Sequence, residues 1–166
     1  MRMLAVLGAL LATCAVAAAA SVHPVARAAA ARCPVTTRGS SAKPPHEFVA
    51  TGMPVPYVRV WLGSRAIWLR LPRRGVLPAL PDPHKRTISS KFPWWRVLAG
   101  NLRAWAQPAG RTGARVRADV KPAADYGPTG FVPSELHFSG PGCWRITGAL
   151  RGHTLSFVTR VVRQSQ

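Results

Sequence analysis

Residues 142–162, with the sequence GCWRITGALRGHTLSFVTRVV, carry the clearest structural pattern in the chain. Apolar and polar residues alternate through both halves, so that Trp144 and Ile146 fall on one face of the first half. This period of two is typical of β-strands that are buried on one side. Arg151-Gly152 separates the halves and suits a tight turn, because glycine adopts the backbone angles that such turns require. The stretch therefore predicts a β-hairpin.

The same alternation occurs earlier in the chain. Residues 73–75 (RRG) indicate a turn between two of these segments. No window after residue 31 shows a sustained 3.6-residue period, and sixteen prolines interrupt the chain, so long helices are not expected. The additional predicted strands are 57–62, 66–71, 88–95, 101–106, 115–120 and 134–138.

About eight short strands at this spacing favour an all-β fold, a single antiparallel β-sandwich with one core. We assign this domain to residues 47–166. Residues 32–46 are rich in Ser, Thr, Pro and Lys without periodicity, which indicates a linker or an extended arm.

The first 31 residues have the composition of a secretory signal peptide. A short basic start is followed by an apolar, alanine-rich run and by small residues that offer cleavage sites. A membrane-spanning helix is the rival interpretation. It needs about 20 strongly apolar residues, whereas this run consists largely of alanine, which is only weakly apolar. Cys14 lies in a loose match to a lipoprotein cleavage box, so lipidation and tethering to a membrane is an alternative to a free secreted protein.

Two cysteines, Cys33 and Cys143, follow the leader. Outside the cytoplasm, two cysteines in one small domain most often form a disulfide, with two free thiols as the alternative. A chain-entropy estimate for a loop of this length gives about 4–5 kcal/mol of stabilisation. We expect Trp144 to pack in the core beside this disulfide.

Five motifs occur in this chain: FxPSxLxF (131–138), PGCWxITG (141–148), LxFV (155–158), KFPWWR (91–96) and YGxTGF (126–131). Together they resemble the C-terminal signature of uncharacterised secreted bacterial proteins with an immunoglobulin-like β-sandwich. The resemblance covers residues 33–162 and implies that fold, export and the Cys33–Cys143 bridge. It implies no activity, and Arg145 stands where those proteins often carry an acidic residue.

The charge of the chain is strongly positive, with 23 Lys and Arg against 5 Asp and Glu and a formal net charge of +18. Such a field attracts nucleic acid, anionic lipid and acidic envelope polymers. The alternative is compositional bias without a selected partner, since the chain is also rich in Ala, Gly and Pro.

The chemistry-bearing residues do not assemble into a known catalytic or metal motif in the sequence. Cys143 has no neighbouring His to activate it as a nucleophile. The His and Cys residues lack the spacing of a copper site, and the five acidic residues show no pairing typical of glycosidases. We therefore predict no catalytic residue, no metal and no cofactor.

Tryptophan and arginine alternate with aliphatic residues in the predicted strands. An outward surface of these side chains would suit carbohydrate stacking or binding to nucleic acid. The alternative is that arginine stems cover the indoles and both sheet faces are partly buried. The candidate binding surface consists of Trp61, Trp68, Trp94, Trp95, Arg59, Arg70 and Arg96.

Three functions follow as hypotheses. The first is a non-enzymatic, extracytoplasmic module that binds a cell-envelope component or a protein through a sheet face. The second is a polyanion-binding protein that acts through its charge, and the third is an enzyme with an unfamiliar site. Salt dependence separates the first two, because charge-driven affinity falls steeply with salt.

Overall fold

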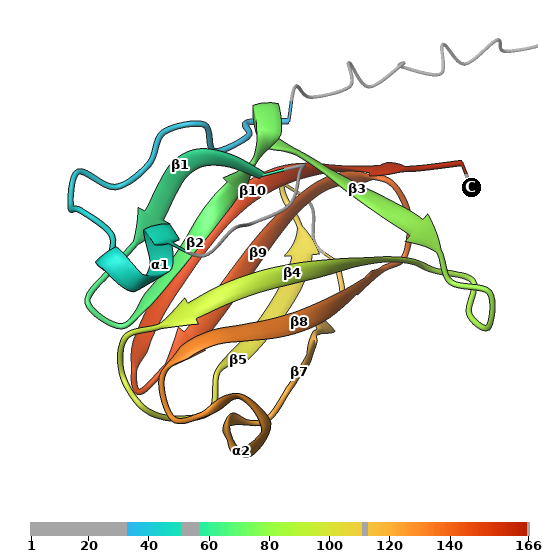
Figure 1. The fold of residues 1–166 in the computed structure, drawn as a ribbon. Helices are drawn as coiled ribbons and strands as arrows, with labels where there is room; N and C mark the ends of the chain where they lie inside the picture. Colours follow the sequence, from blue (N-terminus) through green and yellow to red (C-terminus); the bar gives the residue numbers. More distant parts are fainter. Residues whose placement is uncertain (1–32, 51–56, 111–112, 166) are drawn as a thin grey trace, which may run out of the picture. The chain divides into compact units, whose positions relative to one another are not determined.

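The computed structural model describes residues 33–50, 57–110 and 113–165, and the proposed leader with Cys14 lies outside these residues. The described chain is mostly β-structure, as predicted (Figure 1). Its ten strands are β1 (Tyr57–Gly63), β2 (Ile67–Pro72), β3 (Val76–Pro81), β4 (Ile88–Arg96), β5 (Arg103–Pro108), β6 (Val116–Arg117), β7 (Asp119–Val120), β8 (Gly130–Phe138), β9 (Gly142–Leu150) and β10 (His153–Arg163). Three single-turn helices complete it: α1 (His46–Ala50), the 3₁₀ turn η1 (Arg73–Gly75) and α2 (Ala123–Tyr126).

The strands form one continuous hydrogen-bonded sheet in the order β1-β2-β4-β3-β10-β9-β5-β6, with β8 added to β4 and β7 to β8. Strand β3 joins two sections, because residues 76–79 pair with β10 and residues 80–81 pair with β4. We call β1, β2, β4, β8 and β7 the β4 section, and β3, β10, β9, β5 and β6 the β9 section.

The expectation of a purely antiparallel sheet is wrong at one pairing. Strand β3 runs parallel to β10, whereas the other pairs are antiparallel. The sheet is therefore mixed. Sequence alternation reports which face a side chain occupies but not the direction of the neighbouring strand, so it gave no signal of this pairing.

The core lies between the two sections, which face each other in Figure 1. The rings of Phe92 and Phe157 have their centroids 5.1 Å apart, and those of Phe138 and Trp144 are also 5.1 Å apart. Each pair joins one section to the other. These aromatic contacts hold the two sections together by burying large apolar surfaces from both.

The C-terminal hairpin has the predicted form. Leu150 pairs with His153, and Arg151 and Gly152 both have positive φ angles, 48° and 80°. Two consecutive residues with positive φ match the turn whose twist fits a two-residue hairpin. Trp144 and Ile146 are buried between the sections, as the alternation predicted.

Other segments depart from the sequence-based expectation. Strand β3 was not predicted, because Pro78 and Pro81 mask its alternation. Residues 115–120 keep their predicted alternation but divide at Ala118, whose amide bonds to Ala104 O at 2.9 Å. Because the segment divides there, its two halves join different sections of the sheet. Strand β6 pairs with β5 of the β9 section, and β7 pairs with β8 of the β4 section.

Gly148 lies where β9 packs directly against Trp94 of the β4 section. A Cβ at this position would lie 2.6 Å from Cζ3 of the buried Trp94 ring. We expect Gly148→Ala to lower the free energy of unfolding by about 1–3 kcal/mol, because an overfilled core forces its neighbours to shift. Gly140→Ala is the control, since nothing lies within 4 Å of its Cβ position. Chemical denaturation measures both, and equal stabilities of the two variants would contradict the prediction.

Candidate functional site

Most of the predicted Trp/Arg surface is internal, and this part of the prediction is wrong. The exposed fraction is 4% for Trp68, 0% for Trp94, 8% for Arg70 and 1% for Arg96. The side chain of Arg59 lies outside the described residues. Four of the seven side chains are therefore closed to a large ligand.

The outer face of the β4 section is covered by other parts of the chain. The Arg70 guanidinium lies 4.2 Å from the centroid of Trp61, and Phe48 of α1 packs on Trp61 at 4.7 Å. Phe48 also lies 5.4 Å from Trp95. Arg70 thus covers the indole of Trp61, as the alternative interpretation proposed. Helix α1 covers part of the same face through Phe48.

Trp94 and Trp95 occupy opposite faces of β4, as expected for neighbours in a strand. Trp94 points into the core, where its Nε1 donates to Ser134 Oγ at 2.9 Å. Ser134 Oγ in turn donates to Phe92 O at 3.0 Å. These two hydrogen bonds give a partner to the indole nitrogen of Trp94 and to the hydroxyl of Ser134, both of which are buried.

Arg96 is a buried cation that holds two loops together. Its guanidinium donates to the carbonyls of Gly100 at 2.9 Å and Gly127 at 2.7 Å, with longer bonds of 3.4 Å to Tyr126 and Thr129. Burial lowers the pKa of this guanidinium below its ordinary value. The group remains charged near neutral pH, because arginine does not deprotonate in proteins. Arg96 therefore has a structural role.

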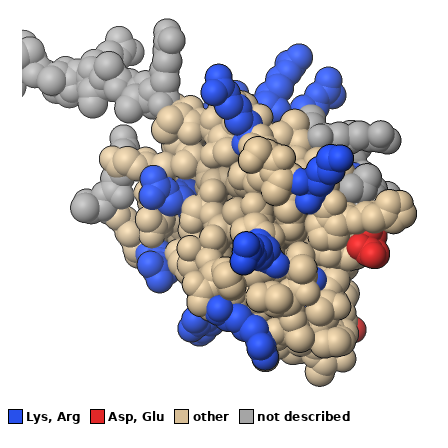
Figure 2. All heavy atoms as spheres, turned by 90° about the vertical axis from the view of Figure 1, so that its left-hand side faces the viewer, with Lys and Arg blue, Asp and Glu red and all other residues tan. Residues whose placement is uncertain are grey.

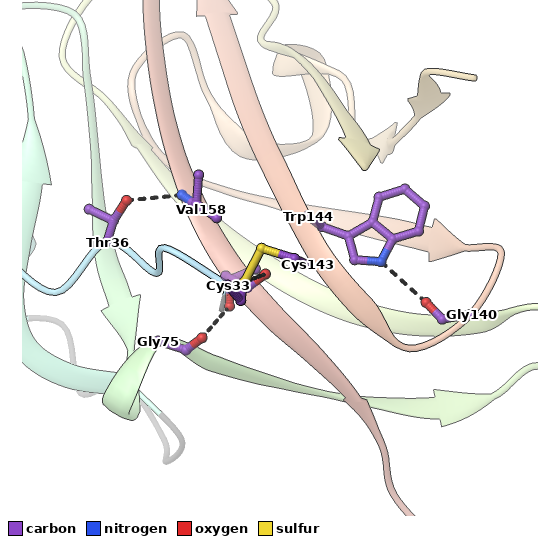
Figure 3. Close-up of a disulfide and its surroundings, with 8 residues drawn as sticks. Cys33, Thr36, Gly75, Gly140, Cys143, Trp144 and Val158 are labelled. Carbon is purple, nitrogen blue, oxygen red and sulfur yellow. Dashed lines mark hydrogen bonds between the residues drawn. A yellow bond between two sulfur atoms is a disulfide. The ribbon is translucent and has the colours of Figure 1, made fainter. Parts of the chain in front are cut away.

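The predicted disulfide between Cys33 and Cys143 is present, with a Cα–Cα distance of 5.4 Å (Figure 3). Near it, Thr36 N donates to Val158 O at 2.8 Å and Val158 N donates to Thr36 Oγ1 at 3.0 Å. Residues 33–45 are thus an arm that is hydrogen-bonded to the sheet. Trp144 is buried next to the bridge, and its Nε1 donates to Gly140 O at 3.2 Å, as the close-up shows.

His137 lies between two carboxylates on the β4 section. Its Nδ1 is 3.5 Å from Asp82 Oδ2, and its Nε2 is 3.2 Å from Asp119 Oδ2. The pKa of Asp82 is lowered, first by the hydrogen bond from the His84 amide to its Oδ1 at 2.9 Å. Within the described residues, no group of three His, Cys, Asp or Glu side chains is arranged to hold a metal ion.

An open basic surface lies instead on the outer face of the β9 section. In β5, Ala104 and Ala106 are buried, so Arg103 and Trp105 point the other way. Trp105 pairs with Arg117 of β6 and with Thr147 of β9, which places their side chains on the same face. Arg145 and Arg160 continue this face on β9 and β10, where both are exposed. We call Arg103, Trp105, Arg115, Arg117, Arg145 and Arg160 the basic face.

Trp105 marks an open depression in the basic face. It has a volume of about 360 Å³ and is lined by Arg103, Ala104, Trp105, Arg115 and Arg117. The Arg115 guanidinium lies 4.6 Å from the centroid of Trp105. The contact with the indole restrains the guanidinium of Arg115 near those of Arg103 and Arg117. Three guanidinium groups in one depression suit an anion with several oxygen atoms.

Acidic groups gather away from the basic face. Asp82, Asp119 and Glu135 belong to the β4 section or its adjoining loop. In the part of the chain that the structure describes, no carboxylate lies within 4.0 Å of a basic-face arginine. Figure 2 shows the side of the molecule that lies at the left of Figure 1, where Lys and Arg are spread widely and the visible acidic side chains lie at one margin.

No protein-family model, curated protein or solved structure matches the chain significantly. None of the helices within residues 33–50, 57–110 and 113–165 has the length and apolar character needed to cross a bilayer. The assignment of a function therefore depends on the residues themselves.

Proposed function

We propose that this protein is a secreted, non-enzymatic binding module of the immunoglobulin-like β-sandwich type that binds an anionic polymer of the cell envelope. The leader-like residues 1–31 support export, and the bridge between Cys33 and Cys143 suits an oxidising compartment. The two sections packed around one core support the sandwich fold. The resemblance to uncharacterised secreted bacterial proteins agrees with both.

The depression around Trp105 carries the proposal. Arg103, Arg115 and Arg117 present three guanidinium groups around a half-buried indole. Guanidinium groups bind phosphate and carboxylate through paired hydrogen bonds. A guanidinium carries a positive charge and only hydrogen-bond donors, so this lining favours binding of an anion over acid–base catalysis.

The test uses a variant in which Arg103, Arg115 and Arg117 are all changed to Gln. We expect its affinity for a phosphate-containing envelope polymer to fall about 100-fold at low salt, because three charge-assisted contacts are lost. The slope of log affinity against log salt should fall by about three, one for each phosphate contact. Isothermal titration across a salt series measures both values.

The matched control changes Arg38, Arg65 and Arg86 to Gln. These side chains are exposed and lie in the arm and in two loops. Changing them removes the same amount of charge as the test variant does. We expect this control to bind within about threefold of the unchanged protein, since distant charges are screened at ordinary salt. An equal loss in both variants would show that net charge alone drives binding, and the proposed site would be wrong.

A further inference from the structure

The basic face extends beyond the depression. Arg145 pairs with Gln107 of β5 on one side and with Val158 of β10 on the other. Arg160 pairs with Cys143, one step further along β9. From strand spacing and rise, neighbouring arginines of the basic face have Cα atoms roughly 7–10 Å apart, and Arg103 to Arg160 spans roughly 20 Å.

Short side chains occupy the outward positions of β9 between Arg145 and the position that pairs with Arg103. Thr147 pairs with Trp105 and with Ser156, and its Oγ1 lies 2.8 Å from Ser156 Oγ. Ala149 occupies the next outward position on β9 and pairs with Arg103. Thr147 is only 7% exposed and Ala149 only 8%, so both lie low on the sheet. The longer side chains around them cover both, so an extended ligand would lie on Arg103, Trp105 and Arg145 rather than on the strands. The Cys33–Cys143 bridge lies on the same face, beside Arg160.

The side chains of the basic face also argue against a lipid surface. Among the described residues, the large apolar side chains that are exposed are Leu80, Val97, Tyr126 and Phe131. None of them belongs to the basic face. A protein that inserts into a membrane surface uses apolar side chains in addition to its cations. Apart from Trp105, the basic face presents cations and short side chains, which favours an anionic polymer over a membrane surface.

We infer that the basic face is a binding track for an extended phosphate polymer, whose phosphates contact the depression and then Arg145 and Arg160 in turn. This inference rests on the proposed function and adds the form of the ligand. It predicts that affinity increases with the number of linked phosphates until the polymer spans the track. A single phosphate contacts arginines of the depression only, so it should bind more weakly than a linked chain.

The experiment measures binding of inorganic phosphate, tripolyphosphate and long-chain polyphosphate to the full chain at equal total phosphate. We expect affinity to rise at least 100-fold from tripolyphosphate to the long chain, because linked groups bind at high effective concentration. Changing both Arg145 and Arg160 to Gln should lower long-chain affinity at least tenfold and leave tripolyphosphate affinity within twofold. The control changes Arg38 and Arg65 to Gln and should preserve both affinities.

The outcomes separate the two proposals. If the long chain binds no better per phosphate than tripolyphosphate, or if the Arg145/Arg160 variant loses both equally, the track is wrong and the proposed anion site still stands. If no phosphate polymer binds at low salt, both are wrong. Two further probes identify the source: an abasic single-stranded phosphodiester should bind like polyphosphate, whereas tighter binding to anionic phospholipid vesicles would overturn the track in favour of a lipid surface.

Discussion

Changing Arg96 to Met is expected to lower the free energy of unfolding by about 2–4 kcal/mol, because several backbone carbonyl groups lose a charged hydrogen-bond donor. Arg96 is 1% exposed, and its guanidinium bonds to the backbone oxygens of residues 100, 126, 127 and 129. Methionine fills much of the same volume but donates no hydrogen bond. The loops before β5 and before β8 would therefore lose their common link.

Chemical denaturation of the Arg96→Met and Arg96→Lys variants measures this effect. Lysine keeps the positive charge but offers an ammonium group in place of a planar fork, so we expect it to recover less than half of the loss. A methionine variant within 1 kcal/mol of the unchanged protein would show that the carbonyls around Arg96 are satisfied in another way.

The second large effect concerns the disulfide. Changing Cys33 and Cys143 together to Ser is expected to lower the free energy of unfolding by about 4–5 kcal/mol, because the bridge closes a long loop in the unfolded chain. The bridged residues are 110 positions apart in the sequence. Without the bridge, the arm keeps only its hydrogen bonds, such as those between Thr36 and Val158.

Thermal unfolding of the double serine variant tests this expectation, with the unchanged protein under reducing conditions as the control. Both samples should show the same loss, since each lacks the bridge and keeps the arm. A loss below 1 kcal/mol in both would mean that the bridge contributes little to the stability of the fold. Hydrogen exchange should also show earlier opening of the arm than of β9 and β10.

The strands of this protein were largely predictable, because alternation is a local property of the sequence. The hairpin of β9 and β10 is correct to the turn residues Arg151 and Gly152. Strand β3 and the parallel pairing of β3 with β10 were not predicted. The prolines of β3 hide its pattern, and pairing direction depends on segments that are far apart in the sequence.

The binding surface was predicted on a face of the sheet that is partly covered by other side chains. Trp61, Trp68 and Trp95 do alternate with core residues, but Arg70 and Phe48 cover part of that face. Trp105 was missed, although the sequence RAWAQ at 103–107 places Arg103 and Trp105 opposite two alanines. That alternation is the signal that would have identified it.

By itself, the sequence determined the strand character and the excess of positive charge and predicted the pairing of Cys33 with Cys143, because each depends on composition or on neighbouring positions. The tertiary structure decided which outward face is open. A helix of five residues and a single arginine cover part of one face, while the arginines of β5, β6, β9 and β10 lie together on the other. Such covering and convergence arise from contacts between distant segments, and no local period encodes them.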